Sequence, residues 1–237
     1  MTLRQDWNHN SFSRRRLLQW AGGTAVALVT SRILNSLPAW AGKRGPMVLS
    51  LQGDAYLGGK PLKKGMSLPT GLEIQAGKQS TLVVSLEDGS LLRLSQGARM
   101  VFGDPMESLR RDIRLAAGHL LAVFRPGGQY RLQGKTVTVG VKGTVLFHAI
   151  LDRDDQKQSF PAKTQEYVCL CNGHVGLENA QAKSLGDWQT EYHHPGFFGT
   201  AGEISGKGFL FGHSDPEIRA LMALGEPDLH PKGWLKH

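Results

Sequence analysis

The stretch Thr81-Leu-Val-Val-Ser-Leu86, with Asp88-Gly89 and Leu91-Leu-Arg-Leu94 after it, predicts two β-strands joined by a tight turn. Apolar and β-branched residues dominate both segments, and such residues favour strands. Asp-Gly is a strong sequence signal for a hairpin, because its glycine adopts the positive φ that the turn requires. This hairpin therefore places the chain among proteins built from antiparallel strands.

Similar segments follow at short spacing, with turn residues between them. Gly118-His119 separates two of these segments, and Asn172-Gly173 is expected to form the turn between two others. Many short strands at regular spacing are typical of a sandwich or roll, so the sequence predicts an all-β fold. The further predicted strands are residues 99–102, 113–116, 120–124, 135–139, 144–151, 165–171 and 175–178.

Near the C-terminus the sequence predicts a single helix. Ser214-Asp-Pro-Glu217 has the spacing of a capping box, in which Ser214 would accept hydrogen bonds from the first-turn amides. An apolar stripe at helical spacing follows and is expected to pack on the sheet. Its members are Ile218, Leu221, Met222 and Leu224. Residues 180–207 are rich in glycine and histidine, and we expect them to be irregular.

The N-terminal segment predicts an export signal of the twin-arginine type. Ser13-Arg-Arg-Arg-Leu-Leu-Gln19 precedes an apolar run of ten residues, 20–29, and Ala39-Trp40-Ala41 offers a small-x-small cleavage site. Ten residues are too few for a membrane-spanning helix, which needs about 20. We therefore expect cleavage after Ala41, which makes residues 1–41 a signal peptide and the mature protein periplasmic. The alternative is a signal retained as an anchor, and only then is membrane contact expected.

The mature chain is long enough for one domain with its own core. We expect a β domain over residues 42–180, with residues 181–237, the irregular segment and the helix, packed on it. The net charge of the whole chain is +8. The predicted signal holds five arginines and one aspartate, so the mature chain carries a net charge of +4. This small excess, without interleaved aromatic and basic residues, argues against a nucleic-acid partner.

Three segments of the β region resemble FecR-type periplasmic domains. They are Asp88-Gly-Ser-Leu-Leu-Arg-Leu94, Arg114-Leu-Ala-Ala-Gly-x-Leu-Leu-Ala-Val-Phe124 and Val139-Gly-Val-Lys-Gly-Thr-x-x-Phe147. The Gly-Val-Lys-Gly-Thr part of the third segment is the most specific. The resemblance covers about residues 71–178 and implies a FecR-like β-sandwich or roll that is exported and senses or binds something. Signalling members relay a signal to a sigma factor through a cytoplasmic segment. Only about a dozen residues precede the arginine motif here, so we do not expect the sigma-regulator role.

Three later motifs resemble a subgroup of single-domain FecR-like proteins. That subgroup has a Cys-x-Cys-x-Gly strand end, a His-His pair and a His-Ser/Thr-Asp helix start. In this chain the motifs are residues 169–173, His193-His194 and His213-Ser214-Asp215. The resemblance implies no settled biochemical activity for them.

Cys169 and Cys171 are the only cysteines, and two thiols on one strand suit a soft or borderline metal ion. Residues i and i+2 of a strand point to the same face, with Cα atoms roughly 6.5 to 7 Å apart, at or beyond the limit for an unstrained disulfide. Zinc, copper and iron are the candidate ions, and a four-coordinate site needs about two more donors. The candidate ligands are Cys169, Cys171, His193, His194 and His213, with His174 in reserve.

Neighbouring residues of a strand point to opposite faces, so we expect only one of His193 and His194 to be a ligand. Two alternatives to a metal site stay open. The cysteines could form an oxidised redox pair, because disulfides persist in the periplasm. They could equally be small buried hydrophobic residues, with the histidines on the surface.

We recognise no catalytic acid–base pair, nucleophile elbow or complete phosphate loop in the sequence, so we expect a protein that is not an enzyme. The first hypothesis is an exported FecR-like binding or signalling module whose partner is an unknown periplasmic protein or small ligand, with or without a Cys/His-bound metal. The second is a small periplasmic redox protein, or an accessory subunit of an exported oxidoreductase, that uses the Cys-x-Cys pair. The third is an adaptor for a protein or glycan, in which the Cys/His set is a structural staple.

Overall fold

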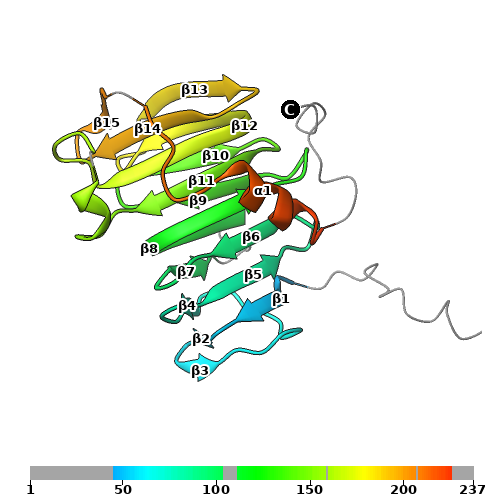
Figure 1. Cartoon of the computed structure of the whole chain (residues 1–237). Coiled ribbons are helices and arrows are strands. Elements are labelled where there is room, and N and C mark those ends of the chain that lie inside the picture. The colour runs from blue at the N-terminus through cyan, green and yellow to red at the C-terminus, as the bar shows by residue number, and fades with distance from the viewer. Residues whose placement is uncertain (1–44, 104–110, 159, 207, 226–237) are drawn as a thin grey trace, which may run out of the picture. The chain divides into compact units, whose positions relative to one another are not determined.

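The computed structural model describes residues 45–103, 111–158, 160–206 and 208–225, and these belong to one compact unit, Lys43–His237. The predicted signal peptide and its cleavage site lie outside the described residues. The described chain is built mostly of strands, as predicted, and they form two sheets that share two long strands (Figure 1). No helix in the described part of the chain is long and apolar enough to cross a membrane.

The first sheet is antiparallel throughout. In spatial order its strands are β1 (Met47–Gln52), β5 (Thr81–Ser85), β6 (Leu91–Leu94), β8 (Arg111–Val123), β11 (Val145–Ile150), β12 (Glu166–Asn179), β14 (His194–Gly199) and β15 (Gly202–Ile204). The predicted hairpin is confirmed as β5 and β6, and Gly89 has the positive φ of 83° that its turn needs.

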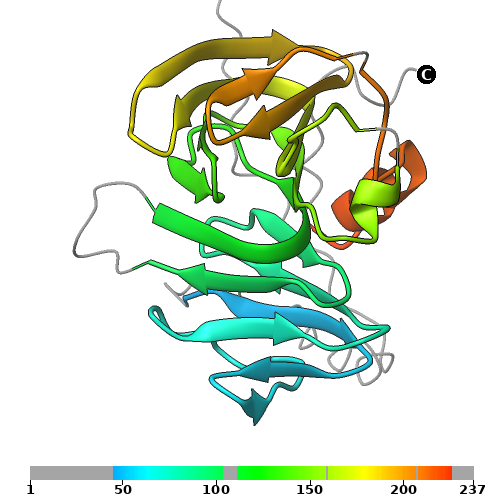
Figure 2. The same ribbon diagram turned by 90° about the vertical axis from the view of Figure 1, so that its left-hand side faces the viewer.

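The second sheet contains β8 and β12 again, and its pairs are antiparallel except β8 with β9. In spatial order its strands are β3 (Lys60–Pro61), β2 (Ala55–Leu57), β4 (Glu73–Ala76), β7 (Arg99–Phe102), β8, β9 (Tyr130–Gln133), β10 (Val137–Val141), β12 and β13 (Ser184–Thr190). Strands β13 and β14 both pair with β12 and curve over the same end of the sheets in Figure 2.

Two predicted strand breaks are wrong, because the structure has continuous strands there. Strand β8 runs through Gly118 and β12 runs through Gly173, and each strand changes sheets at its glycine. The φ angles are 74° and 106°, and an added Cβ at Gly118 would lie 2.6 Å from the Cα of Ala98. A glycine with positive φ can bend a strand around a corner without ending its pairing. The same residue type therefore marks a corner here and a hairpin at Gly89.

The expectation of an irregular segment at residues 180–207 is also wrong, because β13, β14 and β15 all lie in it. Strand β14 has the sequence His-Pro-Gly-Phe-Phe-Gly, which has weak intrinsic strand preference. Its pairing with β12 and the burial of Phe197 and Phe198 impose the extended conformation.

The helix α1 (Asp215–Met222) begins after Ser214, as predicted, and a short 3₁₀ helix, η1 (Asp155–Lys157), lies in the loop between β11 and β12. The predicted capping box is not formed, because the Ser214 side chain makes no cap hydrogen bond to the helix amides. Pro216 has no N–H to donate, and the Ser214 hydroxyl instead donates to Glu217 at 3.0 Å. Of the predicted stripe, Ile218, Leu221 and Met222 are buried, whereas Leu224 lies beyond the helix and is 49% exposed.

The alternation of side chains on β12 divides the interior into two cores. Val168 and Leu170 point into the inner core between the sheets, while Tyr167, Cys169 and Cys171 point to the outer face of the first sheet. There they join the outer core, which α1 covers beside β6 and β8 in Figure 1. The outer core also contains Phe147, Phe197, Ile218, Leu221 and Met222, with Phe209 and Phe211 packed against it.

Candidate metal centre

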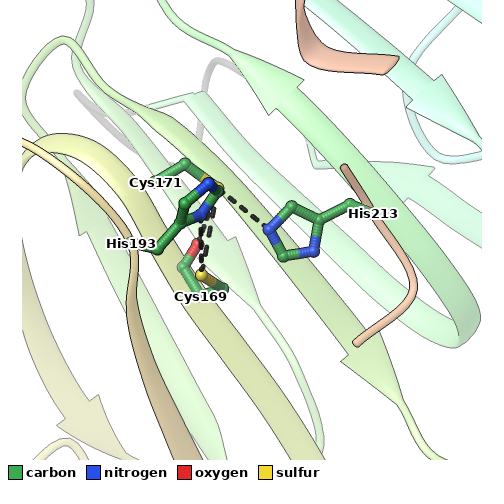
Figure 3. A group of neighbouring side chains, drawn as sticks. All are labelled: Cys169, Cys171, His193 and His213. Atoms are coloured by element: carbon green, nitrogen blue, oxygen red, sulfur yellow. Dashed lines mark hydrogen bonds between the residues drawn. The ribbon is translucent and has the colours of Figure 1, made fainter. Parts of the chain in front are cut away.

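Four of the predicted ligands converge on one point of the outer core (Figure 3). Cys169 and Cys171 come from β12, His193 immediately precedes β14, and His213 lies two residues before α1. Their four donor atoms all lie within 4.8 Å of one another. Three segments that are distant in the sequence therefore supply two sulfurs and two imidazole nitrogens.

The two cysteines share a face, as predicted, and a β-bulge brings them into their observed arrangement. Leu146 of β11 lies opposite Leu170 and Val145 lies opposite Asn172, so Cys171 is the extra residue of the bulge. The two Sγ atoms are 4.0 Å apart and both cysteines are free thiols. The pair is therefore close without being bonded.

The backbone and a carboxylate hold His193 in place. Its N–H donates to the carbonyl of Cys171 at 3.1 Å, and its φ is 23°. Its Nδ1 lies 3.5 Å from the Sγ of Cys169, and its Nε2 lies 2.8 Å from Oδ1 of Asp215. Asp215 also accepts a hydrogen bond from the hydroxyl of Tyr192 at 3.1 Å. Because a carboxylate only accepts, Nε2–H of His193 donates to it and Nδ1 faces the sulfur.

The other imidazole is oriented in a matching way. Nδ1–H of His213 donates to the carbonyl of Phe211 at 2.8 Å, and Nε2 lies 3.3 Å from the Sγ of Cys171. The ring stacks on Phe147, with centroids 4.6 Å apart and an interplanar angle of 17°. Metal-binding histidines usually donate their second ring N–H to a carboxylate or carbonyl, and both histidines here do so.

The spacing of the donors suits a tetrahedral ion. Zinc–sulfur bonds of about 2.3 Å and zinc–nitrogen bonds of about 2.0 to 2.1 Å would separate two sulfurs by about 3.8 Å and a sulfur from a nitrogen by about 3.6 Å. The observed separations are 4.0 Å between the sulfurs and 3.5 and 3.3 Å between sulfur and nitrogen. A zinc ion could therefore be accommodated with shifts of a few tenths of an ångström along these edges.

Burial and mutual contacts shift the pKa values of the group. A hydrogen bond from the Cys171 thiol lowers the pKa of Cys169 to about 4 against the effect of burial, and His193 acts in the same direction. Burial and the same shared hydrogen bond raise the pKa of Cys171. Burial lowers the pKa of His193, but its hydrogen bonds with Cys169 and Asp215 outweigh this and raise it overall. These shifts favour a thiolate at Cys169 and a thiol at Cys171, and a bound metal cation would displace the proton of that thiol.

The structure does not bring His194 or His174 into this group. His194 is paired opposite Leu170, is exposed, and packs on Trp188 with ring centroids 4.6 Å apart. His174 lies 3.8 Å from a carboxylate oxygen of Asp187. Of the adjacent pair, His193 alone faces the cysteines, because His194 begins the regular strand β14.

No sequence motif had indicated the groups that orient the two imidazoles. Asp215 was visible only as part of a helix start, and the carbonyl of Phe211 and the ring of Phe147 carry no motif at all. A helix-start aspartate two residues after a candidate histidine was the one signal available. Its partner proved to be the other histidine, His193, which lies 22 residues away.

Comparison with known proteins identifies the domain that carries the cysteines. The sequence model of the FecR protein family matches residues 73–182. No curated protein matches the chain. Two crystal structures of a “putative anti-sigma factor” from Parabacteroides distasonis, at 2.50 and 1.65 Å resolution, are 15% identical, with a TM-score of 0.43. Each covers 56% of this chain, and this chain spans 56% and 57% of theirs. The segment that matches the FecR family model therefore includes both cysteines of the cluster.

Proposed function

We propose that this protein is an exported FecR-domain binding or signalling module whose C-terminal segment is fixed by a structural metal ion, most suitably zinc. The observation that supports this proposal is the convergence of Cys169, Cys171, His193 and His213, with both imidazoles oriented by second partners. Location in the periplasm, after cleavage behind Ala41, is part of the proposal. Its partner would be a periplasmic protein or small ligand.

The donor set favours a structural role for the metal. Two thiolates and two imidazoles complete a tetrahedral zinc site and leave no open position for a substrate or reactive water. Both cysteines are fully buried and His213 is 8% exposed. Copper and iron also bind such ligands, but a closed tetrahedral set of two sulfurs and two nitrogens is typical of structural zinc.

The ion would join two parts of the chain. Cys169 and Cys171 belong to the sheet, whereas His213 belongs to the C-terminal strap, which we define as residues 208–225. Other contacts of the strap include a hydrogen bond from the Tyr167 hydroxyl to the carbonyl of Phe209 at 2.8 Å. They also include the bond from Arg93 to Glu217 at 3.0 Å. The metal–ligand bonds would hold the strap to the sheet more strongly than these hydrogen bonds do.

Elemental analysis of the mature protein, expressed and purified without oxygen, tests the proposal. We expect about one zinc ion per chain. His213→Ala should lose the metal, whereas His194→Ala, which changes the exposed neighbour of a ligand, should keep it. Wild-type protein that contains no metal and takes up none in a zinc titration would refute the proposal. Separate sequencing of the N-terminus from a periplasmic fraction tests the export and the cleavage after Ala41.

The redox alternative also has an observation in its favour. The two thiols are 4.0 Å apart and the pKa of Cys169 is lowered to about 4, which favours a thiolate. Against it, neither sulfur is exposed, and an electron-exchanging dithiol needs access to its partner. Reversible two-electron titration of metal-free protein, with unchanged folding in both states, would favour this alternative.

A further inference from the structure

We propose that the Cys/His cluster is also a redox-sensitive latch: oxidation of Cys169 and Cys171 to a disulfide expels the metal and releases the C-terminal strap. This inference rests on the proposed function, because the latch is closed by the metal. It adds that metal binding at this site is regulated by oxidation, with a disulfide compound as the oxidant. The argument depends on the geometry of the two sulfurs and on the position of His213 at the start of the strap.

The structure already brings the two sulfurs into van der Waals contact. They are 4.0 Å apart, and a disulfide bond is about 2.05 Å long. A regular strand would hold residues i and i+2 too far apart, but Cys171 is the extra residue of a bulge. Gly173, with φ of 106°, lies two residues after Cys171 and relaxes the backbone restraint on that side. The chain has no other cysteine, so this is its one intramolecular pairing.

The oxidation balances with a disulfide as the oxidant. One cysteine thiolate attacks a sulfur of the oxidant and forms a mixed disulfide, and the oxidant's first thiolate leaves. The second cysteine thiolate then attacks the protein sulfur of this mixed disulfide, forms the Cys169–Cys171 bond and displaces the second thiolate. Two electrons pass from the protein to the oxidant. The metal ion leaves as a dication, and its charge balances the two released thiolates.

Loss of the two thiolates removes two of the four metal ligands. A disulfide sulfur has no negative charge, so only His193 and His213 would remain as donors, two short of a tetrahedral set. Oxidation also takes away the thiol that faces Nε2 of His213 at 3.3 Å. That nitrogen belongs to a residue only 8% exposed, and a buried polar atom without a partner destabilises its surroundings.

His213 transmits this change to the strap. It precedes α1 by two residues, and its Nδ1–H holds the carbonyl of Phe211 at 2.8 Å. Phe211 in turn contacts Phe147 and Tyr167 edge to face, with ring centroids 6.3 and 5.6 Å apart. Release of His213 therefore loosens the aromatic part of the strap first. The surface uncovered is the outer core, which is a face of aliphatic and aromatic side chains.

Because both sulfurs are fully buried, the oxidant can reach them only after the cluster opens. Bound metal should therefore slow the oxidation. The comparison of zinc-loaded with chelator-treated reduced protein isolates this effect, since the two samples differ only in metal.

The experiment starts from reduced, zinc-loaded mature protein and adds oxidised glutathione. Three quantities are followed together: zinc released to a colorimetric chelator, the mass of the protein, and amide hydrogen exchange of residues 208–225. We expect zinc release in step with formation of the disulfide, which lowers the protein mass by two hydrogens relative to the reduced, metal-free chain, and faster exchange in the strap than in β5. Dithiothreitol with zinc should reverse all three. His194→Ala should behave like the wild type.

Several results would overturn the latch while leaving the zinc site intact. They are a protein that keeps its zinc after forming the disulfide, one that forms only glutathione adducts or intermolecular dimers, and one whose strap exchange is unchanged after zinc loss. A protein that binds no zinc before oxidant is added would instead refute the proposed function, and this inference with it. No variant of a ligand is needed, so misfolding cannot obscure the outcome.

Discussion

Two buried polar clusters lie on opposite faces of β11 and β12. They differ in whether hydrogen-bond donors already occupy their acceptor atoms. The outer cluster is the Cys/His group. In the inner cluster, Glu166 accepts hydrogen bonds from the backbone N–H groups of Lys135, Thr136 and Val137, and from the Thr136 hydroxyl. His148 lies beside it, with Nε2 3.9 Å from the carboxylate.

The comparison teaches that burial alone does not identify a metal site. Cys169, Cys171, His148 and Glu166 are all fully buried. In the outer cluster the sulfurs and two imidazole nitrogens, Nδ1 of His193 and Nε2 of His213, point at one another, which suits a cation. In the inner cluster, amides and a hydroxyl already occupy the carboxylate oxygens, and neither ring nitrogen of His148 has a hydrogen-bond partner among the described residues. We therefore interpret the inner cluster as a fold-stabilising contact between the sheets.

The largest expected effect is on the inner cluster. Glu166→Ala leaves three backbone N–H groups and the Thr136 hydroxyl without their acceptor, so we expect a loss of about 4 kcal/mol in the free energy of unfolding. Thr136→Val removes only the hydroxyl and should cost about 1 kcal/mol. Urea denaturation measures both. A loss below about 1 kcal/mol for Glu166→Ala would contradict a structural role for this carboxylate.

The next effect separates the clusters by their metal dependence. At free zinc 100 times the dissociation constant, the wild type should gain about 2.7 kcal/mol of stability over chelator-treated protein. Cys169→Ser should gain nothing, whereas Thr136→Val should gain as much as the wild type. Thermal or urea unfolding with and without zinc gives these differences. Equal zinc stabilisation of Cys169→Ser and the wild type would place the metal elsewhere.

The pH dependence of stability tests His148. Burial lowers the pKa of His148 below its ordinary value of about 6.5, although Glu166 acts in the opposite direction. Below pH 6.5 the unfolded chain therefore takes up a proton that the folded chain does not. Stability should fall with acidification from that point by about 1.4 kcal/mol per pH unit until the folded-state pKa is reached.

His148→Leu removes the titrating group and two unpartnered nitrogens, so its stability should lack this slope. The comparison uses urea unfolding of both proteins between pH 7.5 and 5, at equal metal content, so that the other acidic groups cancel. Parallel stability curves for the two proteins would show that His148 does not stay neutral when folded.

The smallest effect concerns the orientation of a ligand. Asp215→Asn replaces the carboxylate that accepts from Nε2–H of His193, and we expect zinc affinity to fall about tenfold with the fold intact. Tyr192→Phe, which removes the other hydrogen bond to Asp215, should change it less. Competition with a chromogenic chelator measures the affinities, with His194→Ala as the control. Unchanged affinity in Asp215→Asn would remove the carboxylate from the site.

Features that depend only on residues a few positions apart could be predicted from the sequence alone. The alternation of β5 and β6, the Asp-Gly turn between them and the start of α1 after Ser214 follow from local conformational preferences, including those of Ser214 and Pro216 at the helix start. The placement of Cys169 and Cys171 on one face follows from the two-residue repeat of a strand.

The strand corners and the choice of ligands depend on tertiary packing. Gly118 and Gly173 permit a bend or a turn equally well, and the strands that pair on either side made both of them corners. The choice of His193 over His194 depends on the register of β14 against β12. The meeting of His213 with Cys171 joins residues 42 positions apart, which no local pattern specifies, because such a contact forms only when the strap packs on the sheet.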